Sequence, residues 1–200
     1  MHIVFKDTNI DEKLYTIKKY KKGDIIFNDG DICSKIGFLE TGTISIVTNT
    51  YGENEYEINH IDDNGFFGTY LLFSDNPVCL GSAICKKAST VIYFSKTNIL
   101  KAFSDQMFLE NYLKLVSNAS IKLQNKVKIL SQRSIKEKIL FILYQNFQQT
   151  NSRTYRIKSK EEFASLINVT RPSLSRTLIE LESEGILSFD RHTITLKGHL

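Results

Sequence analysis

Two arginines near the start of an expected helix carry the most recognisable chemistry in this chain. Arg171 and Arg176 follow Thr170, a residue type that caps helices, and Pro172 is tolerated in a helix only within the first turn. A guanidinium group can donate two hydrogen bonds to guanine O6 and N7, and a helix N-terminus favours phosphate. The residues expected to face DNA are Thr170, Arg171, Pro172, Ser173, Ser175 and Arg176.

The surrounding sequence predicts a helix-turn-helix that would position these arginines. Ser159 and Glu162 form the S-x-x-E pattern, in which a hydroxyl and a carboxylate satisfy backbone donors at a helix start. The second helix would bury Leu174, Leu178 and Leu181 on one face and leave its polar N-terminal half exposed. Two short helices joined by a tight turn are typical of a motif that reads the DNA major groove.

A β-hairpin is expected after the second helix. Gly185 is suited to end that helix, and apolar runs at 186–189 and 193–196 flank a turn. The hairpin would make the motif a winged helix-turn-helix. A plain helical hairpin with solvated arginines is the structural alternative. The functional alternative is a ligand-sensing or interaction module whose winged domain binds a protein partner instead of DNA.

The composition narrows the class of protein. The 200 residues, 42% of them hydrophobic, suffice for one large domain or two small ones. No signal peptide and no run long enough to span a membrane is found, so we expect a cytoplasmic protein without membrane association. Cys33, Cys79 and Cys85 are widely spaced and form no C-x-x-C pair, which predicts neither a disulfide framework nor a zinc site.

Charge is distributed unevenly along the chain. Residues 1–97 hold 10 Lys/Arg against 13 Asp/Glu, whereas residues 133–200 hold 11 against 7. The basic C-terminal part is therefore the expected side for a polyanionic partner.

The first hundred residues are expected to be mainly β. Short apolar runs recur between glycines and Asp or Asn turns, at a spacing typical of a sandwich or roll. A long helix from about 104 to 131 follows, with an apolar stripe in steps of three and four that predicts a parallel dimer seam. The seam residues are Leu109, Tyr112, Val116, Ala119, Leu123 and Leu130, with Lys126 at the skipped position. The stripe could equally pack on the chain's own roll.

The order of these parts resembles the Crp/Fnr superfamily of bacterial transcription regulators over nearly the whole length. The stretches KKGDIIFNDGD, GFLETGTISIV and GFFGTYLLFSD are similar to its cyclic-nucleotide-binding β-roll, and TRPSLSRTLIELESEGIL is similar to its recognition helix. The resemblance implies an α+β fold with a double-stranded, jelly-roll-like β-roll at 1–103, a dimerisation helix at 104–131 and a winged helix-turn-helix at 132–200. It also implies a homodimer on a two-fold-related operator of double-stranded DNA, with RNA polymerase as a further partner.

The β-roll departs from the family's cyclic-nucleotide-binding pattern. Thr69 stands where the family has a ribose-binding glutamate, and Cys79 or Leu80 where it has a phosphate-binding arginine. A buried phosphate would lack its strongest hydrogen bonds, so we expect an effector other than cyclic AMP. The corresponding effector pocket would comprise Gly68, Thr69, Tyr70, Cys79, Leu80, Ser82, Leu123 and Gln124.

No cofactor and no catalytic site is predicted. An iron–sulfur sensor needs four cysteine ligands, and the chain has three. Its four histidines are scattered, which argues against a haem ligand, and no His/Glu cluster suits a metal. No nucleophile triad or paired carboxylates are found either, so a cupin-like metalloenzyme is disfavoured and a non-enzyme is expected.

Overall fold

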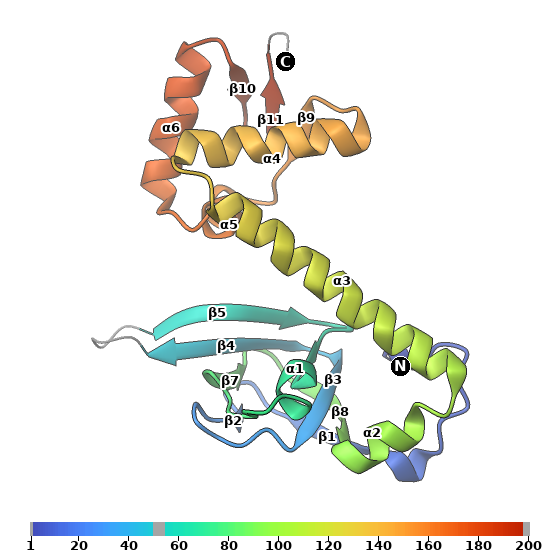
Figure 1. Ribbon diagram of the computed structural model, residues 1–200. Coiled ribbons are helices and arrows are strands. Elements are labelled where there is room, and N and C mark those ends of the chain that lie inside the picture. The colour runs from blue at the N-terminus through green and yellow to red at the C-terminus, as the bar shows by residue number, and fades with distance from the viewer. Residues whose placement is uncertain (1, 50–54, 198–200) are drawn as a thin grey trace. The chain divides into compact units, whose positions relative to one another are not determined.

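The computed structural model describes residues 2–49 and 55–197, which form two compact units (Figure 1). The first unit comprises Met1–Ser117 and the second Asn118–Leu200. The predicted scheme treats 104–131 as a separate helical part, whereas the division between the compact units falls inside that helix. Each unit has its own hydrophobic core.

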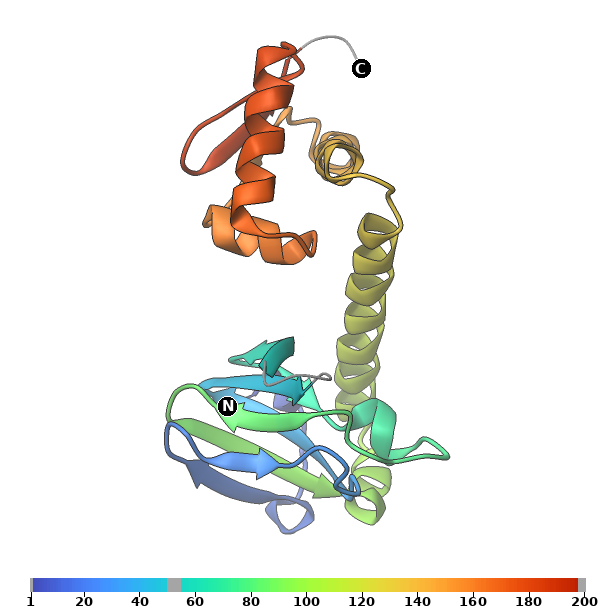
Figure 2. The ribbon, with the colours of Figure 1, turned by 90° about the vertical axis from the view of Figure 1, so that its left-hand side faces the viewer.

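The first unit is a β-roll of two four-stranded antiparallel sheets, as predicted (Figure 2). One sheet has the order β1-β8-β3-β6 and the other the order β2-β7-β4-β5. Its strands are β1 (Thr16–Tyr20), β2 (Ile25–Phe27), β3 (Lys35–Thr41), β4 (Thr43–Asn49), β5 (Glu55–Asp62), β6 (Phe66–Phe67), β7 (Ser82–Cys85) and β8 (Ser89–Ser95). Residues buried from both sheets, among them Leu39, Val91, Ile44 and Ala83, pack together in one cluster between them.

Short helical elements pack against the face of the β1-β8-β3-β6 sheet that points away from the other sheet. They are the 3-10 helices η1 (Ile3–Phe5) and η2 (Glu12–Leu14), and the helices α1 (Thr69–Leu72) and α2 (Lys96–Ala102). Phe38 and Phe94 from the roll are fully buried against Phe108, the third residue of the long helix α3 (Gln106–Leu130). The N-terminal turns of α3 therefore belong to the core of the first unit.

The start of α3 agrees with the sequence. Asp105 accepts a hydrogen bond from the backbone N–H of Phe108 at 2.8 Å and one from Asn9 at 2.9 Å. The carboxylate thus satisfies an orphan donor of the first turn and ties the helix to the N-terminal segment. These hydrogen bonds hold the pKa of Asp105 below its ordinary value.

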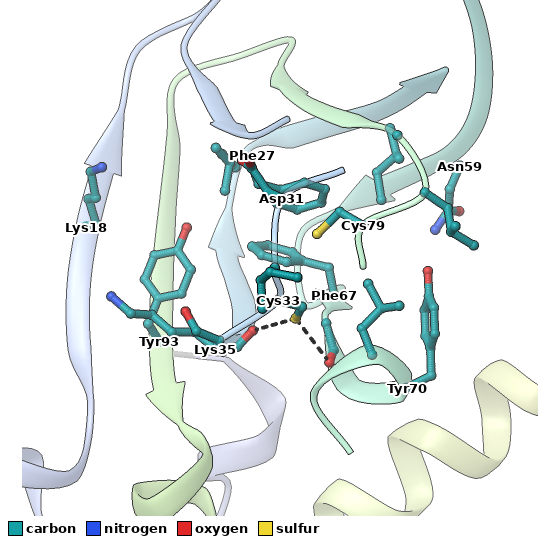
Figure 3. A pocket seen from close by; sticks show the side chains of 18 of the residues that line it. Lys18, Phe27, Asp31, Cys33, Lys35, Asn59, Phe67, Tyr70, Cys79 and Tyr93 are labelled. Atoms are coloured by element: carbon teal, nitrogen blue, oxygen red, sulfur yellow. Dashed lines mark hydrogen bonds between the residues drawn. The ribbon is translucent and has the colours of Figure 1, made fainter. Parts of the chain in front are cut away.

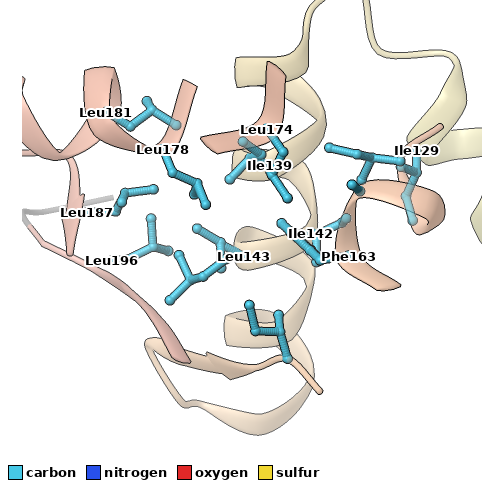
Figure 4. Close-up of a cluster of buried hydrophobic side chains, with 14 residues drawn as sticks. Ile129, Ile139, Ile142, Leu143, Phe163, Leu174, Leu178, Leu181, Leu187 and Leu196 are labelled. Atoms are coloured by element: carbon cyan, nitrogen blue, oxygen red, sulfur yellow. The ribbon is translucent and has the colours of Figure 1, made fainter. Parts of the chain in front are cut away.

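The second unit packs three helices against a three-stranded sheet of order β10-β11-β9. Its elements, besides the end of α3, are α4 (Ile135–Thr150), β9 (Thr154–Arg156), α5 (Lys160–Leu166), α6 (Arg171–Ser183), β10 (Leu187–Phe189) and β11 (Thr193–Leu196). Figure 4 shows the core, in which Leu174 and Leu178 of α6 meet Ile139 and Leu143 of α4. Ile129, near the end of α3, is buried in the same cluster.

Within the described residues, none of the helices combines the length and apolar character of a transmembrane span.

Candidate nucleic-acid interface and ligand cavity

The helix-turn-helix is held by the two caps that its sequence predicts. The Ser159 hydroxyl accepts the N–H of Glu162 at 3.1 Å at the start of α5, and the Thr170 hydroxyl accepts the N–H of Ser173 at 3.4 Å at the start of α6. Pro172 lies in the first turn of α6, where its missing N–H leaves no broken helical hydrogen bond. The turn between the helices contains Asn168 with φ +54°, a left-handed conformation that asparagine tolerates.

Helix α6 has one buried face and one polar face. Leu174, Leu178 and Leu181 have no exposed surface, and they fix the helix on the core of the second unit. The six residues predicted to face DNA are all exposed or half-buried: Thr170, Arg171, Pro172 and Arg176 are exposed, and Ser173 and Ser175 are half-buried. The structure thus brings all six to the N-terminal half of one helix.

Charge on α6 changes sign along its length. The Arg171 guanidinium pairs with Glu161 of α5, with Nε 3.0 Å from Oε1 and both side chains 62% exposed. Arg176 is exposed and makes no hydrogen bond or ion pair with the described part of the chain. The C-terminal half carries Glu180 and Glu182, which phosphate would repel. Only the first two turns are therefore suited to contact a polyanion.

The wing is a tight hairpin formed by β10 and β11. At its tip the Asp190 carboxylate accepts the N–H groups of His192 and Thr193, both at 2.7 Å, and the Thr193 hydroxyl at 2.8 Å. These hydrogen bonds to the ionised form lower the pKa of Asp190. Arg191 and His192 are exposed at this tip. Arg191, which our sequence prediction did not include, is a further cation that could contact phosphate.

The long helix α3 exposes an apolar stripe, but not quite the predicted one. Tyr112 is 8% exposed and packs in the core of the first unit, so its assignment to a dimer seam is wrong. Leu113 beside it is 53% exposed, and Val127, next to the skipped Lys126, is 55% exposed. The exposed apolar residues at steps of four and three are Leu123, Val127 and Leu130, while Leu109 and Val116 earlier in the helix are half-buried and Val116 packs on the core of the first unit. Ala119, which was predicted at the seam, is half-buried, and its place there stays a prediction.

A cavity of about 640 Å³ lies in the first unit between the two sheets (Figure 3). Four of the eight residues predicted for an effector pocket line it: Gly68, Tyr70, Cys79 and Leu80. Gly68 precedes α1 with φ +79°, and a Cβ on it would lie 2.6 Å from the carbonyl oxygen of Lys35. This position therefore requires glycine.

Two of the other predicted pocket residues do not border the cavity. Thr69 is buried, and the Ser82 hydroxyl accepts the N–H of Asp29 at 3.0 Å. Leu123 and Gln124 are exposed on the part of α3 that belongs to the second unit, and all residues lining the cavity come from the first unit. Their part in an effector site stays a prediction.

The sequence prediction missed the aromatic walls of the cavity. The hydroxyls of Tyr20 and Tyr93 lie 2.7 Å apart in a hydrogen bond, and the rings of Phe27 and Phe67 also line the cavity, tilted by 49° with centroids 5.7 Å apart. Tyr20 and Tyr93 are 73 residues apart in sequence and meet because β1 pairs with β8. Alternation along Thr16–Tyr20 could have indicated that Tyr20 faces inward, but not which residue it meets.

The charged side chains that line the cavity are Lys18, Lys35 and Asp31, and all three are exposed. The ammonium of Lys18 lies 4.6 Å from the centroid of the Tyr20 ring, and that of Lys35 lies 5.8 Å from the Tyr93 ring. All six arginines of the chain lie at position 133 or later, so the first unit contains none. Among the described residues, no three His, Cys, Asp or Glu side chains come together as metal ligands would.

Comparisons with known proteins agree with this architecture. A family model for the cyclic nucleotide-binding domain matches residues 17–106, and one for the Crp-like helix-turn-helix domain matches residues 139–198. No curated protein is similar enough in sequence to count as a significant match.

Solved structures with this fold cover nearly the whole chain. CprK complexed with OCPA is 18% identical, with a TM-score of 0.71 and coverage of 93% of this chain and 88% of that chain. A CooA mutant from Carboxydothermus hydrogenoformans is 16% identical, with a TM-score of 0.66 and coverage of 99% and 92%. The catabolite activator protein of Thermus thermophilus is 17% identical, with a TM-score of 0.53 and coverage of 97% and 93%. At these identities the likeness shows the fold, while the two family models together match more than half of the chain. The chain therefore belongs to the Crp/Fnr family of transcription regulators.

Proposed function

We propose that this chain is a sequence-specific DNA-binding regulator that acts as a homodimer in the cytoplasm and has no enzymatic activity. The observation that carries the proposal is the polar N-terminal half of α6. Arg171 and Arg176 are exposed there, on a helix whose opposite face is fixed in the core by three fully buried leucines. A helix held in this way can enter a major groove without refolding, and its arginines can reach base edges and phosphates.

The roles of the individual residues follow from their positions. Arg176 is free to donate to a guanine, a contact worth about 1–3 kcal/mol of discrimination per half-site. Thr170 and Ser173, at the N-terminus of α6, suit phosphate, as does Arg191 on the wing. Pro172 offers no side-chain hydrogen bond, so the base beside it is selected by shape and by its neighbours.

The exposed stripe on α3 is the proposed dimer seam. Leu123, Val127 and Leu130 continue at heptad spacing with large exposed fractions, and a parallel pair of such helices would bury them. A two-fold dimer presents two copies of α6, which fit successive major grooves when they stand about 34 Å apart. The operator would then be two-fold related, and RNA polymerase would be the further partner at a promoter.

An effector other than cyclic AMP is proposed to modulate DNA binding. A cyclic phosphate is best held by a bidentate guanidinium, and the first unit contains no arginine. The cations at the cavity, Lys18 and Lys35, lie over tyrosine rings at its rim. No iron–sulfur cluster, haem or metal is proposed as part of the sensor.

Duplex fragments selected from a random library test this function. Affinity of the full chain should fall steeply between about 50 and 200 mM salt, because several phosphate contacts release counterions. Arg176→Ala should weaken binding at least tenfold and relax the preference at one base pair of each half-site. Arg156→Ala removes the same charge from an exposed position on β9 and is the matched control.

Two results would contradict the proposal. A salt slope near zero, with no retention on any selected duplex, would remove DNA as the partner. Equal effects of Arg176→Ala and Arg156→Ala would show that α6 is not the contact helix, and intact binding of a protein by both variants would favour an interaction module.

A further inference from the structure

The cavity in the β-roll has walls that are mainly apolar and aromatic. Phe27, Phe67, Tyr70 and the rings of Tyr20 and Tyr93 line it, and Figure 3 shows Phe27 and Phe67 side by side within it. Its volume of about 640 Å³ is in the range of small-molecule sites. The Phe67 ring lies directly over the backbone of Gly37, where a Cβ would come within 2.2 Å of Cζ. The lack of a side chain at Gly37 therefore makes room for this ring.

The polar side chains that line the cavity include Lys18, Asp31, Asn59 and the hydroxyl pair of Tyr20 and Tyr93. Tyr20 and Tyr93 share one hydrogen bond of 2.7 Å between two hydroxyl groups. One O–H proton is used in that bond, so the pair keeps one proton to donate and lone pairs to accept. A single ligand oxygen, from a hydroxyl or a carbonyl, is the group that complements this pair. The Cys33 thiol is already engaged with the carbonyl oxygen of Lys35 at 3.4 Å.

The cavity disfavours negative charge. Burial raises the pKa of Cys33 and Tyr93, and it raises the pKa of Cys79 to about 11. Each of these groups becomes an anion when it loses its proton, and in each case desolvation is the largest cause. A carboxylate or phosphate placed among them would meet the same penalty. The two lysines cannot offset it fully, because their ammonium groups are exposed at the rim.

We propose that this cavity binds an uncharged aromatic compound that carries one hydroxyl or carbonyl oxygen, with that oxygen on the Tyr20–Tyr93 hydroxyl pair. The rings of Phe27 and Phe67 pack against the aromatic body. Tyr70 and Leu80, which are 67% and 66% exposed, lie at the mouth, where an apolar compound would enter. We take the cavity as the effector site of the regulator proposed above, so this assignment rests on that function. It adds the chemical class of the effector.

Two probes of nearly equal size separate this ligand class from an anion. 2-Naphthol is uncharged at neutral pH and carries one hydroxyl, whereas 2-naphthoate is an anion. Equilibrium dialysis with the full chain should give saturable binding of one 2-naphthol per chain, at least tenfold tighter than binding of 2-naphthoate or cyclic AMP. Binding that depends on apolar contact and one hydrogen bond should change little with salt.

Variants locate the bound probe. Tyr93→Phe keeps the ring and removes one hydroxyl, and it should weaken 2-naphthol about fivefold, as expected for one hydrogen bond of about 1 kcal/mol. Cys79→Trp fills the cavity and should abolish saturable binding. Leu100→Ala changes an exposed leucine on α2 that does not line the cavity and should leave binding unchanged. Thermal melting of each variant distinguishes lost binding from lost folding, and Tyr93→Phe decides the matter if Cys79→Trp does not fold.

Three results would overturn the assignment: no saturable 2-naphthol binding, binding of 2-naphthoate or cyclic AMP as tight as that of 2-naphthol, or 2-naphthol binding unaffected by Tyr93→Phe. The DNA-binding proposal is measured separately on the same preparation. Retention of selected duplexes without 2-naphthol binding would reject the ligand class alone. 2-Naphthol binding without retention of any duplex would reject the regulatory role alone.

Discussion

Removing the negative charge from the ion pair between Arg171 and Glu161 should lower the stability of the fold slightly and raise the affinity for DNA. The Glu161 carboxylate lies 3.0 Å from the Nε of an arginine that we expect to contact DNA. A DNA phosphate that approaches Arg171 must therefore compete with this carboxylate. We predict that Glu161→Gln, which keeps the shape and a hydrogen-bond acceptor but removes the charge, tightens DNA binding.

The distance between the Glu161 carboxylate and a DNA phosphate bound to Arg171 sets the size of the expected gain in affinity. A phosphate oxygen about 3 Å beyond the guanidinium would lie about 6 Å from the carboxylate, and two such charges repel by about 0.7 kcal/mol in water and about 2.8 kcal/mol at an effective dielectric constant of 20. Screening by salt reduces these values, so about 1 kcal/mol per half-site is expected. Two half-sites give about 2 kcal/mol, or about 30-fold in affinity. The pair is 62% exposed on both sides, so its loss should cost the fold less than about 1 kcal/mol.

Fluorescence anisotropy with a selected duplex measures the affinity, and urea unfolding measures the stability. Glu180→Gln removes the same charge from the exposed surface of the C-terminal half of α6 and should change the affinity less than about threefold. In the background of Arg171→Ala, Glu161→Gln should lose most of its effect, because the two residues act through one contact. An affinity that is unchanged or lower in Glu161→Gln, with Arg171 intact, would refute competition at this arginine.

Three further predictions concern the core, the seam and the start of α3. Leu178→Ala should destabilise the second unit by about 3 kcal/mol in urea unfolding, because the side chain is fully buried, while Ile179→Ala, 59% exposed, should change it by less than about 1 kcal/mol. Leu123→Glu should convert the dimer to a monomer in sedimentation experiments, whereas Ile121→Glu, 55% exposed but off the stripe, should stay dimeric; equal behaviour of the two would contradict the seam. Asp105 has a lowered pKa, so its stabilising contribution is complete above the unfolded-state value of 3.8 and is lost as the pH falls through the lowered folded value. The difference in Tm between the wild type and Asp105→Asn should therefore be constant from about pH 7 to pH 5 and shrink below about pH 4.

Local chemistry made the helices predictable. Ser159 and Thr170 each accept the backbone N–H three residues ahead, at the positions where their sequence patterns predict helix starts. Such caps depend on residues close in sequence, so a pattern contains all the information needed. The six residues expected to face DNA lie within seven positions of one helix, and for this reason the sequence could place them together.

Contacts between distant segments were harder to predict. Leu109 and Tyr112 are both apolar and three residues apart, so the helical periodicity alone allows Tyr112 to lie either on the exposed stripe or in the core. Only its packing in the aromatic core of the roll shows that Tyr112 points inward. The cavity depends on strand pairing in the same way. Its Tyr20–Tyr93 pair and its Phe67 ring over Gly37 arise from the register of β1, β8, β3 and β6, which no local pattern specifies.

Because the arginines are confined to the C-terminal part of the chain, the two proposed binding events should depend differently on ionic strength. Guanidinium groups, which suit bidentate bonds to phosphate and bases, occur only from Arg133 onward, while the first unit has lysines alone. DNA binding through α6 should then weaken steeply with ionic strength, since it releases counterions. Binding of an uncharged aromatic compound between the sheets should respond to apolar burial and hardly to salt. Without DNA, occupancy by such a ligand should hardly depend on ionic strength. Because coupling is reciprocal, a ligand that raises the DNA affinity by a fixed factor must itself bind tighter by that factor when DNA is bound, so its salt dependence should appear only in the presence of DNA.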